Sequence, residues 1–210
     1  MVLENHFFWI KNAIPKRYCD LLIKQGLSQE SIDATTGDFQ NRNVKDNPLN
    51  KKEKKFLHKT RKSNVVWIVE TWLYRLYQPF VHYANQKAGW NFQWDFSENN
   101  QFTIYNKGQY YGWHCDSWKL PYNTPNDLNR HGKVRKLSST ILLNDGKEFK
   151  GGEFEFDYRD ETKKNTEIVE NLTEAGDMIV FPSHLFHRVK PVTKGRRYSL
   201  VSWHLGRPFQ

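Results

Sequence analysis

The second half of the chain is a succession of short runs in which apolar and polar residues alternate. Trp90 to Phe96 shows the pattern most clearly, with an aromatic residue at every second position. When apolar residues recur at every second position of a strand, their side chains all lie on one face. Short strands with turns about every ten residues are typical of a mainly β, double-sheet jelly roll. The other strands predicted here are 101–105, 110–115, 137–143, 153–156, 178–181, 187–192 and 197–204.

Two glycine-containing segments are the turn signals that bear on strand order. Asn106-Lys107-Gly108 lies between the predicted strands 101–105 and 110–115 and should connect them. Asn144-Asp145-Gly146 follows the run 137–143 and is a typical hairpin turn sequence. We therefore expect a hairpin at the second of these places.

The first residues combine a strand with a helix. Phe7 to Ile10 is an apolar run that predicts a first strand. Pro15 suits the first turn of a helix, where its missing N–H costs nothing. Apolar residues then recur at helical spacing, and Gly26 is suited to ending the helix.

A second helix is predicted just before the alternating runs. Val65 to Val69 is compatible with a strand or with the entry to a buried helix. Helical spacing of apolar residues then continues over 72–84, and Gly89 should end this helix. Pro79 lies inside the pattern and is expected to kink or split the helix.

The length of 210 residues suits a single domain with a sizeable core. We predict one domain over 1–210, with a helical part at about 1–89 and a jelly-roll core at about 90–206. The N-terminal helices are expected to pack on one sheet, because each has a single apolar face to bury.

Two polar stretches interrupt the apolar patterns. Residues 29–62 lose their apolar periodicity, and the basic run within them, 51–62, is expected to be a solvated loop or a short exposed helix. A sharper hypothesis makes that run a flap, mobile without substrate, that helps to hold the substrate. Residues 119–136 predict a long loop of the kind that is usually functional or disordered.

Composition excludes few functions. The net charge of +9 is compatible with an acidic partner or nucleic acid but selects neither. The sequence contains no apolar run of about 18 residues and no recognisable secretory signal, so a cytoplasmic protein without a membrane partner is expected. Cys19 and Cys115 could form one disulfide, but reduced thiols are expected in that compartment.

His114 and Asp116 form a His-x-Asp pair near the end of the predicted strand 110–115. Residues two apart on a strand point to the same face, so an imidazole and a carboxylate project together. Among the remaining histidines, His187 is the candidate third ligand, in the run 181–189. Two histidines and one carboxylate, with the other positions open, form the facial triad of non-haem Fe(II) oxygenases.

Arg197 supplies a candidate anchor for an organic acid. Its planar fork could hold a carboxylate through two parallel hydrogen bonds, which a lysine could not do. Ser199 lies at the next position on the same strand face, and Arg196 is expected to face solvent. Cys115 lies between two candidate ligands and should face away from the metal.

The ordered set of motifs resembles the Fe(II)/2-oxoglutarate-dependent dioxygenases, and within them the prolyl 4-hydroxylase-like branch, or PKHD-type hydroxylases. The resemblance covers roughly half the chain. The residues that carry it are Tyr105-x-x-Gly108-x-x-Tyr111-x-x-His114-x-Asp116-Ser117, Leu137-Ser138, Leu143-Asn144, Gly151-Gly152-Glu153, Gly176-Asp177, Phe181-Pro182-Ser183, His187-Arg188-Val189 and Arg197-Tyr198-Ser199.

The resemblance implies Fe(2+) as cofactor, 2-oxoglutarate and O2 as co-substrates, and ascorbate as a further cofactor. It assigns Fe(II) to His114, Asp116 and His187, and the distal carboxylate of 2-oxoglutarate to Arg197. Tyr105 is a candidate hydrogen-bond donor to that carboxylate. Ser199 belongs to the same co-substrate site, and the expected pocket walls are Tyr111, Trp113 and Trp203. Many relatives have a tyrosine before the Leu-Asn turn where this chain has Leu142, so no second tyrosine contact is expected from that strand.

The activity implied by the resemblance is hydroxylation of an unactivated C–H, most simply on proline in a peptide or protein. Hydroxylation of a free amino acid or other small molecule is the alternative. A nucleic-acid dealkylase of the same superfamily would follow the pattern Arg-x-Asn-x-x-x-Arg from the anchor, whereas this chain has Ser199 and Trp203 at the last two of these positions. A jelly-roll binding module without iron chemistry is disfavoured by the complete triad together with Arg197.

Overall fold

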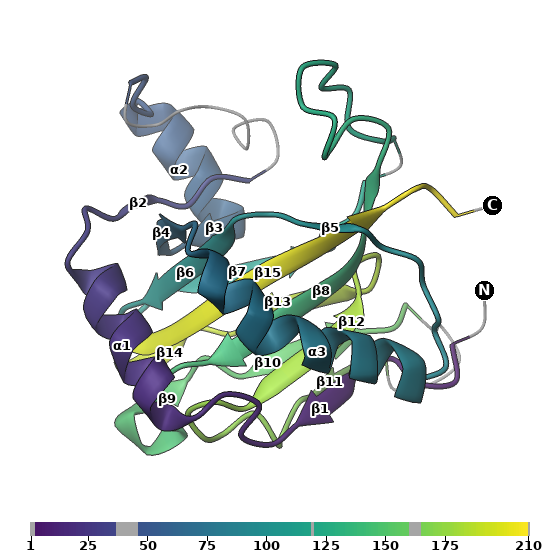
Figure 1. Ribbon diagram of the computed structural model, residues 1–210. Coiled ribbons are helices and arrows are strands. Elements are labelled where there is room, and N and C mark those ends of the chain that lie inside the picture. Colours follow the sequence, from purple (N-terminus) through teal and green to yellow (C-terminus); the bar gives the residue numbers. More distant parts are fainter. Residues whose placement is uncertain (1–2, 37–45, 119, 160–164, 210) are drawn as a thin grey trace.

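The computed structural model describes residues 3–36, 46–118, 120–159 and 165–209. Figure 1 shows two β-sheets with helices at their outer surfaces. The helices are α1 (Lys16–Leu27), α2 (Lys51–Thr60) and α3 (Thr71–Lys87), with one 3-10 turn, η2 (Gly146–Glu148). The strands are β1 (Phe8–Ile10), β2 (Ile32–Asp33), β3 (Arg61–Lys62), β4 (Asn64–Ile68), β5 (Phe96–Ser97), β6 (Asn100–Tyr105), β7 (Tyr110–His114), β8 (Val134–Leu142), β9 (Phe149–Gly151), β10 (Phe154–Asp157), β11 (Thr166–Ile168), β12 (Met178–Pro182), β13 (Phe186–Val189), β14 (Val192–Gly195) and β15 (Arg197–Gly206).

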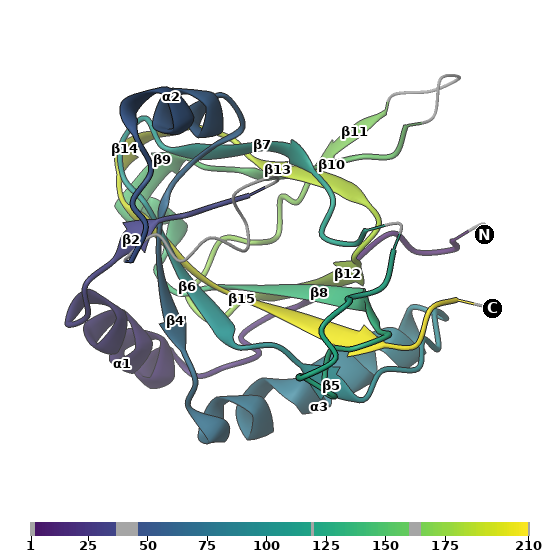
Figure 2. The same cartoon turned by 90° about the horizontal axis from the view of Figure 1, so that it is seen from above.

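The sheets are antiparallel and face each other, as the predicted jelly roll requires (Figure 2). The larger sheet has the order β1-β12-β8-β15-β6-β4-β2, and β5 also pairs with β15. The smaller sheet has the order β11-β10-β13-β7-β3, and β14 and β9 form a separate pair. Strands from the first 89 residues therefore belong to both large layers, in addition to the helices predicted there.

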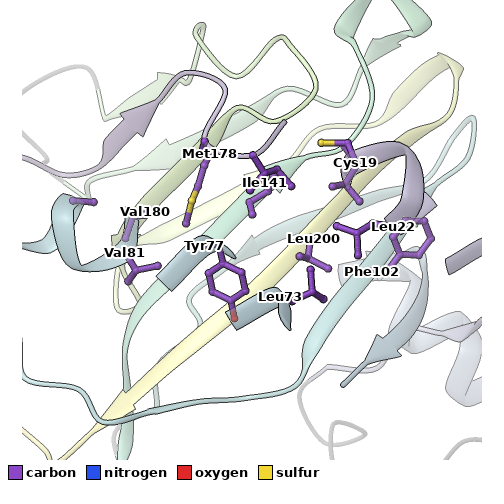
Figure 3. Close-up of a cluster of buried hydrophobic side chains, with 14 of the residues drawn as sticks. Cys19, Leu22, Leu73, Tyr77, Val81, Phe102, Ile141, Met178, Val180 and Leu200 are labelled. Carbon is purple, nitrogen blue, oxygen red and sulfur yellow. The ribbon is translucent and has the colours of Figure 1, made fainter. Parts of the chain in front are cut away.

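The main hydrophobic core lies between the larger sheet and the helices α1 and α3 (Figure 3). Cys19 and Leu22 of α1 meet Phe102 of β6, while Leu73 and Tyr77 of α3 belong to the same cluster. The helices therefore pack on one sheet, as predicted. Among the described residues, no helix combines the length and the apolar character needed to cross a bilayer.

Alternation along the central strands divides side chains between two environments. In β15, Leu200 joins the core under the helices, whereas Arg197, Ser199 and Val201 line a cavity between the sheets. In β6, Phe102 likewise faces the helices. A second apolar cluster, which includes Ile179 and Phe181 of β12, fills part of the space between the sheets.

The predicted helix end at Gly26 was wrong, and of the two effects predicted for Pro79, a kink or a split, the split was wrong. Helix α1 continues through Gly26, whose hydrogen lies against Phe102: a Cβ atom there would be 2.3 Å from the ring. The glycine permits close packing rather than ending the helix. Helix α3 also continues through Pro79 and is not split. Pro79 and Arg75, one turn earlier, are both exposed, so water can reach the carbonyl that loses its N–H partner.

The alternating segment Trp90 to Phe96 forms a strand only at its end, where β5 begins. Its burial alternates as expected, but the side chain of Asn85 in α3 takes the place of a partner strand. The Asn85 amide donates to the Phe92 carbonyl at 2.9 Å and accepts from the Phe92 N–H at 3.0 Å. The pattern therefore identified the buried face correctly and the hydrogen-bonding partner wrongly.

The expected hairpin at Asn144-Asp145-Gly146 is also wrong. The chain enters η2 there, and the next strand, β9, pairs with β14 rather than with β8. The Asn144 side chain accepts from the Tyr198 N–H and donates to the Arg196 carbonyl, which holds the segment against β15. The predicted strand 187–192 is divided between β13 and β14, which belong to different sheets.

In their described residues, the two polar stretches contain β2, α2, β3 and the start of β8. Residues 51–60 form that helix, in which Leu57 is buried and the other residues are exposed or half-buried. It begins with a capping box between Asn50 and Glu53. The short exposed helix is therefore the alternative that the structure shows for these residues, while the flap hypothesis stays a prediction. Residue 119 lies outside the described residues, and β8 begins at Val134, inside the predicted loop 119–136.

Candidate active site

Two imidazoles from neighbouring strands face the space between the sheets. His114 at the end of β7 pairs in register with His187 of β13, and their ring centroids are 4.1 Å apart. The Nδ1 atom of His114 lies 2.8 Å from the Gly112 carbonyl, and that of His187 lies 3.0 Å from the Leu185 carbonyl. Because a carbonyl can only accept, each Nδ1 carries the proton and each Nε2 keeps a lone pair. Both Nε2 atoms are therefore suited to bind a metal.

Asp116 follows β7 and brings a carboxylate to the same point. Its Oδ1 lies 3.8 Å from His114 Nε2, and its Oδ2 lies 3.6 Å from His187 Nε2. Ligand atoms from these three residues all lie within 4.8 Å of one another. The Ser138 hydroxyl donates to Asp116 Oδ2 at 2.7 Å, and the Asp116 N–H donates to the Ser183 carbonyl at 2.8 Å. These bonds orient the carboxylate toward the imidazoles.

The electrostatics of this cluster favour metal binding. Burial lowers the pKa of His187, and burial together with the nearby His187 lowers the pKa of His114 well below its ordinary value. Both rings are therefore neutral near pH 7, as ligation requires. Burial alone would raise the pKa of Asp116, but the surrounding His187, His114, Arg135 and Ser138 outweigh it and hold the pKa below its ordinary value. The set offers two neutral nitrogens and one anionic oxygen donor.

Arg197 lies in the same cavity and is 1% exposed. Its Nη1 donates to the Ser199 hydroxyl at 3.1 Å. Its Nη2 is buried and has no hydrogen-bond partner within the described residues. Burial lowers the pKa of Arg197, since desolvation disfavours the cation. A buried donor without an acceptor is uncommon. The Arg197 side chain lines a cavity of about 30 Å³ that the three candidate ligands also line.

Gly152 makes room for this arginine. Its φ is +70°, and a Cβ atom would lie 3.0 Å from Arg197 Cδ. Tyr105 lies beside the guanidinium, whose carbon is 5.6 Å from the ring centre. Burial raises the pKa of Tyr105, so its hydroxyl stays protonated and can donate a hydrogen bond. Tyr105 and Ser199 thus lie on one face with Arg197, as the alternation predicted.

A β-bulge decides which aromatic residues of β7 reach the cavity. His114 pairs with His187 and Tyr111 with Val189, so three steps along β7 oppose two along β13. Tyr111 and His114 consequently face the same side, with ring centroids 3.4 Å apart. Trp113 does not line the cavity and instead packs on Arg188, whose guanidinium carbon lies 4.4 Å from the centre of the Trp113 ring. Among the three predicted wall residues, Tyr111 and Trp203 line the cavity and Trp113 does not, and the wall role itself stays a prediction.

A groove of about 580 Å³ adjoins this cavity and opens toward the surface. The cavity and the groove share several lining residues: Arg61, Gln101, Tyr111, Asp116 and Trp203. Arg61 and Gln101 were not predicted as site residues, and Arg61 belongs to the basic run 51–62, which was interpreted as solvated. The available signal was the period-two series Arg61, Ser63 and Val65, which extends the strand pattern back into that run.

These residues fit an iron ion and a dicarboxylic co-substrate. The two Nε2 atoms and the Asp116 carboxylate leave the rest of a metal's coordination sphere open. The unpartnered Nη2 of Arg197 supplies a donor for a carboxylate in the same enclosed space. Together, the antiparallel jelly roll and this set of donor atoms are typical of the non-haem iron oxygenases.

The chain belongs to the 2OG-Fe(II) oxygenase superfamily, whose family model matches residues 100–205. It is 34% identical over 104 residues to a PKHD-type hydroxylase of Pseudoalteromonas atlantica, an alignment that covers 49% of this chain and 41% of that protein. A PKHD-type hydroxylase of Teredinibacter turnerae is 33% identical over 103 residues, with the same coverage. The chain thus spans about two fifths of the length of these curated relatives.

Solved structures agree on the fold. A viral collagen prolyl hydroxylase of Paramecium bursaria Chlorella virus-1, in its 2OG complex, has a TM-score of 0.64 and 18% identity, with 97% of both chains covered. A prolyl-4-hydroxylase of Pseudomonas putida has a TM-score of 0.65 and 18% identity, with 96% of this chain and 93% of that chain covered. At these identities the likeness establishes the jelly-roll fold and not the substrate.

Proposed function

We propose that the protein is an Fe(II)- and 2-oxoglutarate-dependent dioxygenase that hydroxylates an unactivated C–H. His114, Asp116 and His187 hold the iron, and Arg197, with Ser199 and Tyr105, holds the distal carboxylate of 2-oxoglutarate. The observation that carries the proposal is the enclosure of the three donor atoms and the unpartnered Arg197 Nη2 in one cavity.

The bound iron and 2-oxoglutarate would supply the oxidising chemistry, with O2 as the second co-substrate. The side chains of this protein would bind the iron and 2-oxoglutarate, orient them and enclose them. The backbone carbonyls that face the two Nδ1 atoms fix the imidazole tautomers, and Ser138 orients Asp116. Phe154 stacks on His187 with a centroid distance of 5.3 Å and limits the access of water to that side.

We further propose proline in a peptide or protein as the substrate and the 4-position as the site of hydroxylation. The PKHD-type relatives and the prolyl hydroxylases among the solved structures support this choice. One of those structures, from Trichoplax adhaerens, contains a peptide fragment. The groove beside the cavity has a volume of about 580 Å³ and is lined by the aromatic side chains Trp67, Trp118 and Trp203.

The test is anaerobic reconstitution with Fe(II), followed by assays with O2, 2-oxoglutarate, ascorbate and proline-containing peptides. We expect bound iron, succinate formation, and peptides that gain one oxygen atom by mass spectrometry. His114→Ala should abolish iron binding and succinate formation, because it removes one of three ligands. His184→Ala is the matched control, since His184 is exposed and outside the cluster. Unchanged iron content and turnover in His114→Ala would contradict the assignment.

A further inference from the structure

Arg61 is a second buried guanidinium, outside the residues proposed for iron and 2-oxoglutarate. It is 5% exposed. Its Nε donates to the Ser63 hydroxyl at 3.0 Å, its Nη1 to the Thr35 carbonyl at 3.5 Å, and its Nη2 to the Gln101 side-chain oxygen at 3.4 Å. Within the described part of the chain these acceptors are neutral and two of the bonds are long, so the charge lacks a close anionic partner.

The two other arginines that line the groove, Arg130 and Arg135, each lie close to a carboxylate. Arg135 Nη2 lies 2.5 Å from Glu98 Oε2, and Arg130 Nε lies 3.4 Å from Glu98 Oε1. Arg130 is also close to Asp127, at 3.6 Å. Burying a charge without a counter-charge is unfavourable, so a compensated cation needs no ligand whereas an isolated one does. Arg61 is therefore the groove cation best suited to receive an anion.

The location of Arg61 restricts where such an anion would bind. The side chain lines both the cavity with the three candidate ligands and the open groove. Its guanidinium carbon lies 4.3 Å from the centre of the Tyr111 ring, and that ring stacks on His114 at 3.4 Å. One aromatic ring thus separates Arg61 from a proposed iron ligand. A group bound to Arg61 from the groove would be a near neighbour of the carbon presented to the iron.

We propose that Arg61 binds a carboxylate of the substrate, close to the C–H that is hydroxylated. The inference rests on the proposed function and adds a chemical requirement to it. The distal carboxylate of 2-oxoglutarate is assigned to Arg197, so Arg61 remains for the substrate. Trp67 and Trp203, with ring centroids 6.2 Å apart, offer an apolar surface beside it for the body of the substrate. The carboxylate can be the α-carboxylate of a free or C-terminal residue, or the side chain of a neighbouring acidic residue.

The experiment compares probes that differ only in this charge. The full chain is loaded with Mn(II), which replaces the redox-active iron, and with 2-oxoglutarate, and both binding steps are recorded by calorimetry. N-acetyl-L-proline is then compared with N-acetyl-L-prolinamide, and an N-acetyl-Pro-Asp-amide with its Pro-Asn counterpart. The first pair reports an α-carboxylate and the second an acidic side chain.

In at least one pair, we expect the acid to bind about tenfold or more tightly than its amide, because the amide cannot form the buried charge pair with Arg61. Arg61→Gln should reduce that ratio to near one, and Arg61→Lys should retain part of it, because the charge remains while the planar fork is lost. Lys62→Gln is the matched control: it removes the same charge from the adjacent, exposed position of β3 and should keep the full ratio.

Three results would overturn the proposal. The first is that neither acid is preferred by the unaltered protein, whether both members of a pair bind equally or neither binds. The second is an undiminished preference in Arg61→Gln with intact circular dichroism. The third is a large loss of 2-oxoglutarate affinity in that variant, which would place Arg61 in the co-substrate site. Failure of the proposed function is distinct, because Mn(II) and 2-oxoglutarate would then not bind before any probe is added.

Discussion

Arg197 illustrates how much one side chain depends on its neighbours. Strand alternation places it on the inner face of β15 opposite Tyr105, while the adjacent Arg196 is exposed. Substitution of these two arginines, which are adjacent in sequence, should therefore affect the binding of 2-oxoglutarate differently. Within the described residues, Nη1 of the inner guanidinium donates to the neutral Ser199 hydroxyl and Nη2 has no hydrogen-bond partner, so an incoming carboxylate would supply an acceptor.

Arg197→Ala should bind Fe(II) normally and require far more 2-oxoglutarate. Breaking a buried charge pair costs about 3–5 kcal/mol, which corresponds to roughly two to three and a half orders of magnitude in affinity. Arg197→Lys should lose less, because charge remains without the fork. The measurement is 2-oxoglutarate titration of the metal-loaded protein, with Arg196→Ala as control. An impaired Arg196 variant beside a normal Arg197 variant would show that the anchor is wrongly assigned.

At the scale of elements, irregular features bring the functional side chains together. The β7 bulge turns Tyr111 and His114 to the same side, which regular alternation could not do over three residues. Gly152 allows the stem of Arg197 to approach its backbone. Helix α2 lies against β3 and β7, and the chain continues from it into β3 at Arg61.

Helix α1 provides a test of packing between elements. Gly26→Ala would place a methyl group 2.3 Å from the ring of Phe102, which is fully buried and has little room to move. Although alanine favours a helix, we expect a net loss of about 1–3 kcal/mol in the free energy of unfolding. Urea unfolding measures it, with Lys24→Ala on the exposed face of the same helix as control. Equal or greater stability in the Gly26 variant would show that α1 can move away from β6.

At the scale of the whole molecule, the N-terminal segments are built into both sheets. β1 pairs with β12 and β4 pairs with β6, while β3 adds to the smaller sheet beside β7. The helices α1 and α3 cover the larger sheet. The prediction of one domain over 1–210 stays a prediction, and this arrangement leads us to expect a single cooperative unfolding transition.

The stability of the molecule should depend on pH through buried His204. The ring lies between the hydroxyls of Ser97, at 2.8 Å, and Ser139, at 3.3 Å, and burial lowers its pKa to about 3. The folded protein therefore keeps this ring neutral, whereas the unfolded chain takes up a proton below about pH 6.5. Protonation favours the unfolded chain, so the stabilising contribution is complete above pH 6.5 and is lost as the pH falls toward 3.

Between pH 7 and pH 5 this group alone should remove about 2 kcal/mol from the free energy of unfolding. The measurement is urea unfolding of metal-free protein at several pH values. His204→Asn should show a shallower dependence of the free energy of unfolding on pH than the unaltered protein. If the wild-type protein and His204→Asn have equal slopes, His204 is not the group responsible.

The sequence by itself determined the inward face of the last strand and which residues are candidates for the chemistry. Alternation placed Arg197, Ser199 and Trp203 on one face, and His114, Asp116 and His187 were selected by residue type and order. These are local properties, because side-chain direction follows from the period of the strand. The tertiary structure alone decided the hydrogen-bonding partner of each segment. Partner choice depends on packing between residues distant in the chain, and so Asn85 rather than a strand holds Phe92, β9 pairs with β14, and Arg61 of a basic run is buried beside the candidate metal site.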